Sequence, residues 1–242
     1  MHTAEDTAER TARAIGDLPA NFMLDSATYD TGNSLGFDGV DFYVVGRGGA
    51  LGDVSAGVVA AAFVFFNPAM IHERWERGIQ VMAPSHAALA FAGCLHAWSQ
   101  NHLPSGVDYA RLAELTGKVV ATASPAGAPL FAGWLTLPEP TEARALALHR
   151  INALRELRGA LHGGAVLAAG LDPRVALLIK TPFMAAIFGW EEPHPDVGLA
   201  KDAWGAAEAA TNRAMSRVFA ALDAAEQAEL IRLLDAAHQG VH

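Results

Sequence analysis

The sequence predicts an all-α fold, a multi-helix bundle, from three observations. Apolar residues recur at helical spacing in most segments, as in residues 141–171. Prolines stand where first helical turns are expected, and Asp223 with Glu226 three places later forms a capping-box pattern. No alternation of apolar and polar residues persists, so we expect at most a short hairpin.

The N-terminal half supplies helix signals in order along the chain. Residues 4–18 form an amphipathic segment, and residues 19–37 are rich in turn formers, so we predict a helix followed by a turn region. Segments 68–82 and 84–103 both begin with proline, which favours the first turn of a helix. Residues 108–123 continue in the same style.

A Pro- and Gly-rich stretch at 124–140 interrupts this pattern. We therefore predict an N-terminal helical region at 1–123, a connector at 124–140 and a C-terminal helical region at 141–242. The C-terminal region reads as a helix over 141–171, a short helix over 172–181, a loop over 182–198 and two terminal helices. Asp172 and Pro173 give the short helix its N-cap and first turn.

Composition limits the classes of function. The chain has 242 residues, a hydrophobic content of 52%, a mean hydropathy of +0.20 and a net charge of -9. The acidic balance argues against an extensive nucleic-acid surface. The longest uncharged run, Val54 to Ile71, is broken by Asn67-Pro68 and falls short of the ~20 apolar residues of a membrane span. We interpret it as a buried helix, and with no secretion signal we expect a cytoplasmic protein.

Metal and nucleotide motifs are incomplete. The stretch His72-Glu73-Arg74-Trp75-Glu76 lacks the second histidine of a zinc motif, so we expect no metal site, and the sequence names no cofactor. The glycines at 46–52 have Leu51 where a dinucleotide motif needs its third glycine, and no Gly-Lys-Ser/Thr follows. We therefore interpret them as a helix break that turns Arg47 into the interior.

Two stretches, 41–71 and 154–173, resemble motifs of an actinobacterial family of helix-turn-helix proteins of unknown function. That family is distantly similar to winged-helix regulators of the multiple-antibiotic-resistance (MarR) class. The first motif is matched by Gly46, Arg47, Leu51, Gly52, Phe66 and Pro68. The second is matched by Leu154, Arg155, Glu156, Arg158, Gly159 and His162, whereas Leu157, Ala160 and Leu161 depart from it. The resemblance covers roughly residues 35–180 and implies a degenerate winged-helix-like C-terminal half.

One departure bears on DNA binding. Relatives carry a recognition-type helix and a wing after the helix at 172–181, whereas this chain has only residues 182–198, with two glutamates and an aspartate. Reading base edges requires a helix that presents Arg, Lys, Asn or Gln. Binding of nucleic acid is therefore doubtful on the sequence.

Three arginines among apolar neighbours are the first candidate site residues. A charge in such surroundings must be paired or meet a ligand. Arg155 and Arg158 are three residues apart on one helical face and, with Arg47, could bind a carboxylate or phosphate. The alternative is a structural network in which the arginines pair with Glu73, Glu76 or Glu156.

Two histidines and two aromatic residues complete the candidates. His162 precedes two glycines and His72 is near Trp75, so either histidine could act as a general base or be structural. Trp75 and Phe66 could line an apolar ligand pocket or belong to the core.

These residues favour a regulator-like homodimer, formed through terminal helices, that binds a small, partly apolar molecule, with an anionic group as one option. Weak or absent DNA binding accompanies this hypothesis. Two alternatives stay open: a cofactor-independent enzyme that uses the same His and Arg pocket, and a DNA-binding transcriptional regulator.

Overall fold

The computed structural model describes residues 3–241, and within them it contains helices and no strand, which confirms the all-α prediction. The α-helices are α1 (Ala4–Leu24), α2 (Ser26–Ser34), α3 (Asp41–Gly48), α4 (Ala56–Ala62), α5 (Pro68–Gly78), α6 (Pro84–His102), α7 (Tyr109–Thr122), α8 (Pro129–Trp134), α9 (Ala143–Ala168), α10 (Pro173–Lys180), α11 (Lys201–Phe219) and α12 (Ala224–Gln239). Three 3-10 turns are η1 (Gly49–Leu51), η2 (Pro182–Met184) and η3 (Gly198–Ala200).

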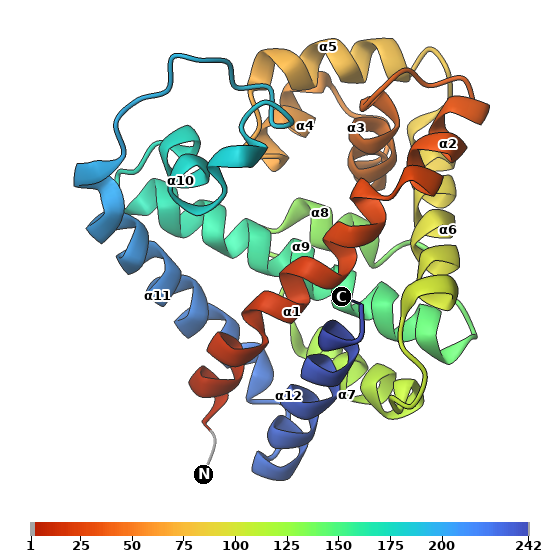
Figure 1. Cartoon of the computed structure of the whole chain (residues 1–242), viewed down its shortest axis with the longest axis vertical. Helices are drawn as coiled ribbons and strands as arrows, with labels where there is room; N and C mark the ends of the chain where they lie inside the picture. Colours follow the sequence, from red (N-terminus) through yellow and green to blue (C-terminus); the bar gives the residue numbers. More distant parts are fainter. Residues whose placement is uncertain (1–2, 242) are drawn as a thin grey trace.

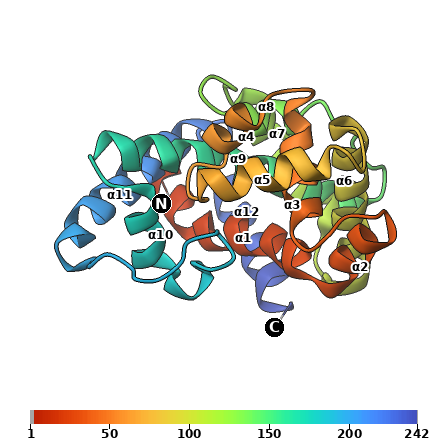
Figure 2. The ribbon, with the colours of Figure 1, turned by 90° about the horizontal axis from the view of Figure 1, so that it is seen from above.

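The long helix α9 runs through the middle of the bundle and contacts α1, α6, α7, α8, α10 and α11 (Figure 1). Helices α3 and α6 lie toward one end of it, and α10 and α11 lie toward the other. Seen from above, α5 and α4 lie over α9, with α10 at one end of the molecule and α2 at the other (Figure 2). Elements from both ends of the chain therefore meet α9.

Helix starts agree with the predicted caps. Pro68, Pro84 and Pro173 occupy the first turns of α5, α6 and α10, where a missing N–H costs no helical hydrogen bond. The capping box of Asp223 and Glu226 opens α12. Local sequence chemistry therefore sets these boundaries.

The prediction of a turn region at 19–37 was wrong. Helix α1 continues through Pro19 to Leu24 and buries Leu18 and Phe22, and α2 follows after Asp25, whose carboxylate accepts a hydrogen bond from the backbone N–H of Ala27 at 2.8 Å. Burial of the large apolar side chains outweighs the hydrogen bond that Pro19 removes.

We predicted one buried helix over the uncharged run Val54 to Ile71, and this prediction was wrong. Helix α4 ends at Ala62, a turn over 63–67 follows, and Val58 on α4 is exposed by 47%. In the part of the chain that the structure describes, no helix is long and apolar enough to span a membrane.

The predicted connector 124–140 contains a buried helix. Leu130, Phe131 and Trp134 of α8 are buried, and the indole Nε1 of Trp134 donates a hydrogen bond to the carbonyl of His149 on α9 at 3.0 Å. One large hydrophobic cluster takes residues from α1, from α8 and from α12. A small second cluster contains the buried residues Val166, Leu171, Ala176 and Ala207.

Between α10 and α11 the chain forms only η2, η3 and irregular structure, which we call the 182–200 segment. Three hydrogen bonds fasten residues 188–190 of this segment to the turn after α4. The backbone N–H of Asn67 donates to the carbonyl of Phe188 at 2.8 Å, its side-chain amide donates to the carbonyl of Gly189 at 2.9 Å, and Trp190 Nε1 donates to the carbonyl of Phe65 at 2.9 Å. Phe188 of this segment lines a pocket together with Arg47 of α3 and Arg155 of α9, and we call it the central pocket.

Candidate functional site

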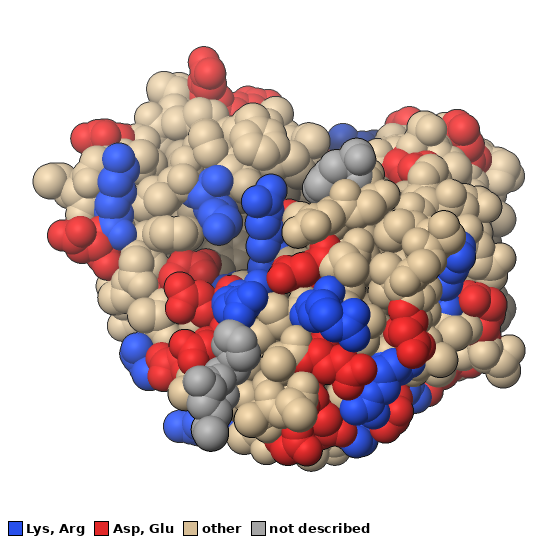
Figure 3. Space-filling view, turned by 60° about the horizontal axis from the view of Figure 1, so that its bottom comes forward, with Lys and Arg blue, Asp and Glu red and all other residues tan. Residues whose placement is uncertain are grey.

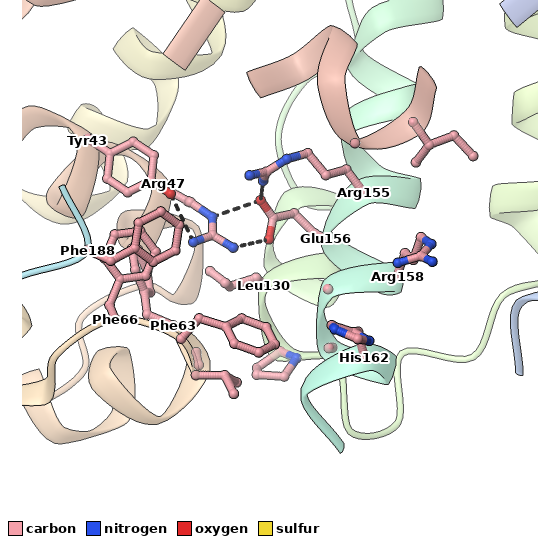
Figure 4. Close-up of a pocket in the computed structure, with 18 of the residues that line it drawn as sticks. Tyr43, Arg47, Phe63, Phe66, Leu130, Arg155, Glu156, Arg158, His162 and Phe188 are labelled. Atoms are coloured by element: carbon pink, nitrogen blue, oxygen red, sulfur yellow. Dashed lines mark hydrogen bonds and ion pairs between the residues drawn. The ribbon is translucent and has the colours of Figure 1, made fainter. Parts of the chain in front are cut away.

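Five of the seven residues singled out in the sequence meet in one pocket with a volume of about 240 Å³. Its walls come from α1, α3, the turn after α4, α8, α9 and the 182–200 segment, and Figure 4 shows its labelled side chains. The five residues are Arg47, Phe66, Arg155, Arg158 and His162. A ligand in this pocket would touch both halves of the chain.

The other two candidates lie elsewhere. Trp75 is only 1% exposed and belongs to the large hydrophobic cluster, where its ring packs close to Gly48 of α3. His72 is exposed on α5 and does not line the pocket. The structure does not bring these two residues together with the arginines.

Arg47 points into the interior, as the glycines around it predicted. Its Nε and Nη2 donate to the two carboxylate oxygens of Glu156 at 2.9 and 2.7 Å, and its Nη1 donates to the Tyr43 hydroxyl oxygen at 3.2 Å. The guanidinium carbon also lies 4.4 Å from the centre of the Phe63 ring. Gly46 permits this placement because a Cβ there would lie 2.7 Å from the Cβ of Phe91 on α6.

The Arg47–Glu156 pair is buried, with side chains 12% and 3% exposed. Burial alone would lower the pKa of Arg47 and raise that of Glu156, but their mutual attraction dominates, so the pKa of Arg47 is raised and that of Glu156 is lowered. Both groups therefore stay charged. This pairing matches one of the structural alternatives that the sequence left open.

Arg155 shares the same carboxylate. Its Nη1 donates to Glu156 Oε1 at 3.0 Å, the same oxygen that accepts from Arg47 Nε (Figure 4). Two guanidinium groups thus face a single buried carboxylate, which leaves one positive charge without a partner charge at this wall. Such a charge beside apolar side chains favours an anion.

Arg158 belongs to a second network, which joins α9 to α11. Its Nη2 donates to Glu208 at 2.9 Å and to the Asn212 side-chain oxygen at 3.2 Å. Its Nε is buried and has no hydrogen-bond partner among residues 3–241. Arg158 and Glu208 balance each other in charge, in contrast to the surplus at Arg155.

His162 lies beside this second network. The Thr211 hydroxyl donates to the carbonyl of Ala207 at 2.7 Å, so its oxygen accepts from Nδ1–H of His162 at 3.0 Å. Burial lowers the pKa of His162, and the carboxylate of Glu208, 3.5 Å from Nε2, opposes that shift.

Aromatic rings form the opposite wall. Phe66 and Phe188 stack with their centres 3.9 Å apart, and Tyr43 stacks on Phe66 at 5.7 Å. Phe65 stacks on the imidazole of His162 at 5.6 Å. Polar groups from α3 and α9 thus face rings supplied by the turn after α4 and by the 182–200 segment.

That turn is strained. Val64 has a φ of 26°, which a β-branched residue rarely adopts, and it lines the pocket. Its side chain packs on Gly163 of α9, where a Cβ would lie 3.0 Å from Val64 Cγ2. Because Gly163 has no side chain, the strained turn can pack closely on α9, and this contact positions the aromatic wall.

No group of three or more His, Cys, Asp or Glu side chains that could hold a metal occurs within residues 3–241. One histidine pair lies away from the pocket and against Trp134: Nε2 of His96 is 3.2 Å from Nδ1 of His149. Burial lowers the pKa of His149 to about 4, and repulsion from His96 adds to that shift.

Sequence reasoning missed the residues that complete the site. Tyr43 stands four residues before Arg47 in the same helix, and this spacing could have marked it as a partner. Glu208, Thr211 and Asn212 form a polar stripe at helical spacing on α11. No local pattern could have shown that this stripe faces α9.

Comparisons with known proteins give one result. A family model described as a helix-turn-helix family matches residues 8–242. Neither the curated proteins nor the solved structures contain a match to the chain. The family match spans both halves of the bundle and every residue of the pocket.

Proposed function

This chain belongs to a helix-turn-helix family, and on that premise we propose that it is a regulator-like protein that binds a small, partly apolar anion in the central pocket. The observation that carries the proposal is the surplus charge at Arg155. Arg47 and Arg155 share one buried carboxylate, while the rest of that wall is apolar or aromatic. An anionic ligand would supply the missing negative charge.

We propose further that DNA contact is weak. Helix α10 follows α9 after a short turn, yet it exposes little beyond Lys180, since Ala176, Leu177 and Leu178 are buried. Its Arg174 donates hydrogen bonds to the carbonyls of Glu191 and Pro193. The segment after it contains no α-helix to place in a groove and no strand to form a wing.

Surface charge supports the same proposal. Basic and acidic side chains are interspersed on the face shown in Figure 3, without a continuous basic surface. A net charge of -9 also opposes the phosphate contacts that supply most nonspecific DNA affinity.

A second candidate function is a DNA-binding regulator, and the family match favours it. Fluorescence anisotropy with labelled duplexes that the protein has enriched from a random-sequence pool at low salt separates the two candidates. We expect weak binding that disappears as salt rises. Tight binding that persists at physiological salt would favour the DNA-binding candidate.

The enzyme alternative rests on His162, which is the histidine that lines the pocket. It predicts that His162→Gln removes turnover of a bound substrate without loss of affinity. The homodimer and the cytoplasmic location likewise stay predictions. Analytical ultracentrifugation would test the dimer.

Two glycines of α9 provide a matched test of the ligand proposal. A Cβ added at Gly159 or at Gly164 meets no atom within 4 Å, but only Gly159 lines the pocket. Gly159→Leu should therefore fill the pocket, whereas Gly164→Leu should not. Native mass spectrometry of the proteins as purified should show an extra mass in the wild type and in Gly164→Leu that is lost in Gly159→Leu.

An extra mass retained by all three proteins would place the ligand outside the pocket. The absence of any extra mass, together with no binding of added carboxylates, would contradict the proposal.

A further inference from the structure

A second, smaller pocket of about 60 Å³ adjoins the central one. Four residues line both: Tyr43, Phe66, Arg155 and Phe188. The rest of its lining is mostly aliphatic or methionine, including Met23, Leu24, Met70, Met184 and Ile187. The two pockets thus lie next to each other, and Arg155 lines both of them.

Arg155 is the cation most available to a ligand in this space. Arg47 already uses three nitrogens on Glu156 and Tyr43, and Arg158 is balanced by Glu208. Arg155 donates one hydrogen bond to protein within the described chain, from Nη1 to Glu156. Its guanidinium has further donors, in a planar fork that suits a carboxylate.

Charge limits the ligand to one negative group. One positive charge is left over where Arg47 and Arg155 face Glu156, and the Arg158–Glu208 network adds none. A dianion would introduce a second charge into a space whose other walls are aromatic and aliphatic.

The smaller pocket suits a flexible apolar tail. Methionine side chains are unbranched and polarizable and adapt to the shape of an apolar group. Leu24 and Ile187 at this pocket are 48% and 43% exposed, so a tail that covers them would remove apolar surface from water. Both volumes are small beside the roughly 300–1,000 Å³ of usual ligand pockets, which favours a compact molecule.

From these observations we infer that the ligand is a monocarboxylate with a short flexible apolar tail. Its carboxylate binds Arg155, and its tail enters the methionine-lined pocket and continues over the exposed side chains of Leu24 and Ile187. This inference rests on the proposed function, because it names the chemical class of ligand for the same central site.

Octanoate is the probe, with octan-1-ol and acetate as controls. Octan-1-ol has the tail without the charge, and acetate has the charge without the tail. Isothermal titration calorimetry should show octanoate binding at least about tenfold tighter than either control, since charge-assisted hydrogen bonds and tail burial both contribute. Octanoate that binds no better than acetate would overturn the tail assignment.

Two variants test the carboxylate position and the tail position of the ligand separately. Arg155→Met keeps the Arg47–Glu156 pair and should weaken octanoate at least about tenfold while leaving octan-1-ol unchanged. Ala20→Phe fills the smaller pocket, which Ala20 lines, without touching the central one. It should weaken octanoate and leave acetate unchanged. Leu24→Asn, at a half-exposed position, removes apolar surface without adding charge and provides the same test if Ala20→Phe does not fold.

The failure of this inference is distinguishable from that of the proposed function. If the copurified mass depends on Gly159 but octanoate does not bind, the ligand class is wrong and the ligand-binding proposal stands. If octanoate binding is insensitive to both Arg155→Met and Ala20→Phe, the assignment of head and tail is overturned.

Discussion

The two hydrophobic clusters of this protein differ in what they support. The large cluster takes buried residues from nearly every helix between α1 and α12, whereas the small one has four buried residues, from α9, the turn after it, α10 and α11. The turn after α4 joins them, because Phe63 and Phe66 belong to the large cluster and Phe65 packs on the small one. The central pocket lies at this junction.

This difference between the clusters predicts that the two walls of the central pocket differ in rigidity. Arg47 and Glu156 are buried beside the large cluster, while Glu208 is 22% exposed on α11 near the small cluster. Regions with few buried apolar contacts open at lower free energy than the global core. We therefore expect the Glu156 side of the pocket to be preorganised and the α10–α11 side to adjust to a ligand.

Substitution of the two glutamates should give the largest contrast. Glu156→Leu leaves Arg47 as a buried charge without its partner, so we expect a loss of about 3–5 kcal/mol in the free energy of unfolding, measured by urea denaturation. Glu208→Leu on the other wall should cost less, about 1–3 kcal/mol, because Glu208 is itself 22% exposed and Arg158 keeps its hydrogen bond to Asn212. Equal losses would mean that the two walls do not differ.

Combining Glu156→Leu with Arg47→Met serves as the control for that contrast. The double variant removes both buried charges and should recover much of the lost stability. No recovery would show that packing, and not the uncompensated charge, causes the loss.

Acid should destabilise the large cluster through His149. Its pKa is lowered by burial to about 4 in the folded protein, against an ordinary value of 6.5. Between pH 6.5 and pH 4 the unfolded chain binds more protons than the folded protein. The free energy of unfolding is therefore highest above pH 6.5 and falls by on the order of 3 kcal/mol as the pH approaches 4. Urea titrations of His149→Gln across this range should show a flatter dependence on pH.

The neighbouring glycines of α9 give the smallest and most local contrast. Gly164→Ala should raise the free energy of unfolding by about 1 kcal/mol, since its Cβ enters open space in a helix. Gly163→Ala should lower it, because its Cβ would press on Val64 in the strained turn that joins the clusters. Thermal denaturation of the two variants side by side measures the difference, and an equal gain in both would exclude tight packing at Gly163.

Local patterns predicted much of the fold. Prolines and capping residues fixed the starts of α5, α6, α10 and α12 because they act within one helical turn. They failed at 19–37, where burial of Phe22 against Phe91 of α6 overrides the turn formers. They also missed α8 in the middle of the predicted connector 124–140, whose apolar side chains belong to the large cluster.

The site was predictable in part. Apolar neighbours and glycines correctly indicated that Arg47 turns inward, and helical spacing placed Arg155, Arg158 and His162 together. Their partners depended on tertiary contacts: Glu208 is 50 residues from Arg158 in sequence and meets it only through the packing of α11 on α9. From the sequence we therefore predicted the same anion-binding role for Arg155 and Arg158. In the structure Arg158 is paired in a charge-balanced network, whereas Arg155 carries the surplus positive charge.

The most direct test is a crystal structure of the protein as purified, with attention to the space between Arg155 and Phe188. We expect continuous density for one bound molecule whose anionic end lies within hydrogen-bond distance of the Arg155 guanidinium and whose apolar part lies against Phe66 and Phe188. A space filled by ordered water, with Arg155 turned away to a partner on the protein, would contradict a ligand site at the junction of the two clusters.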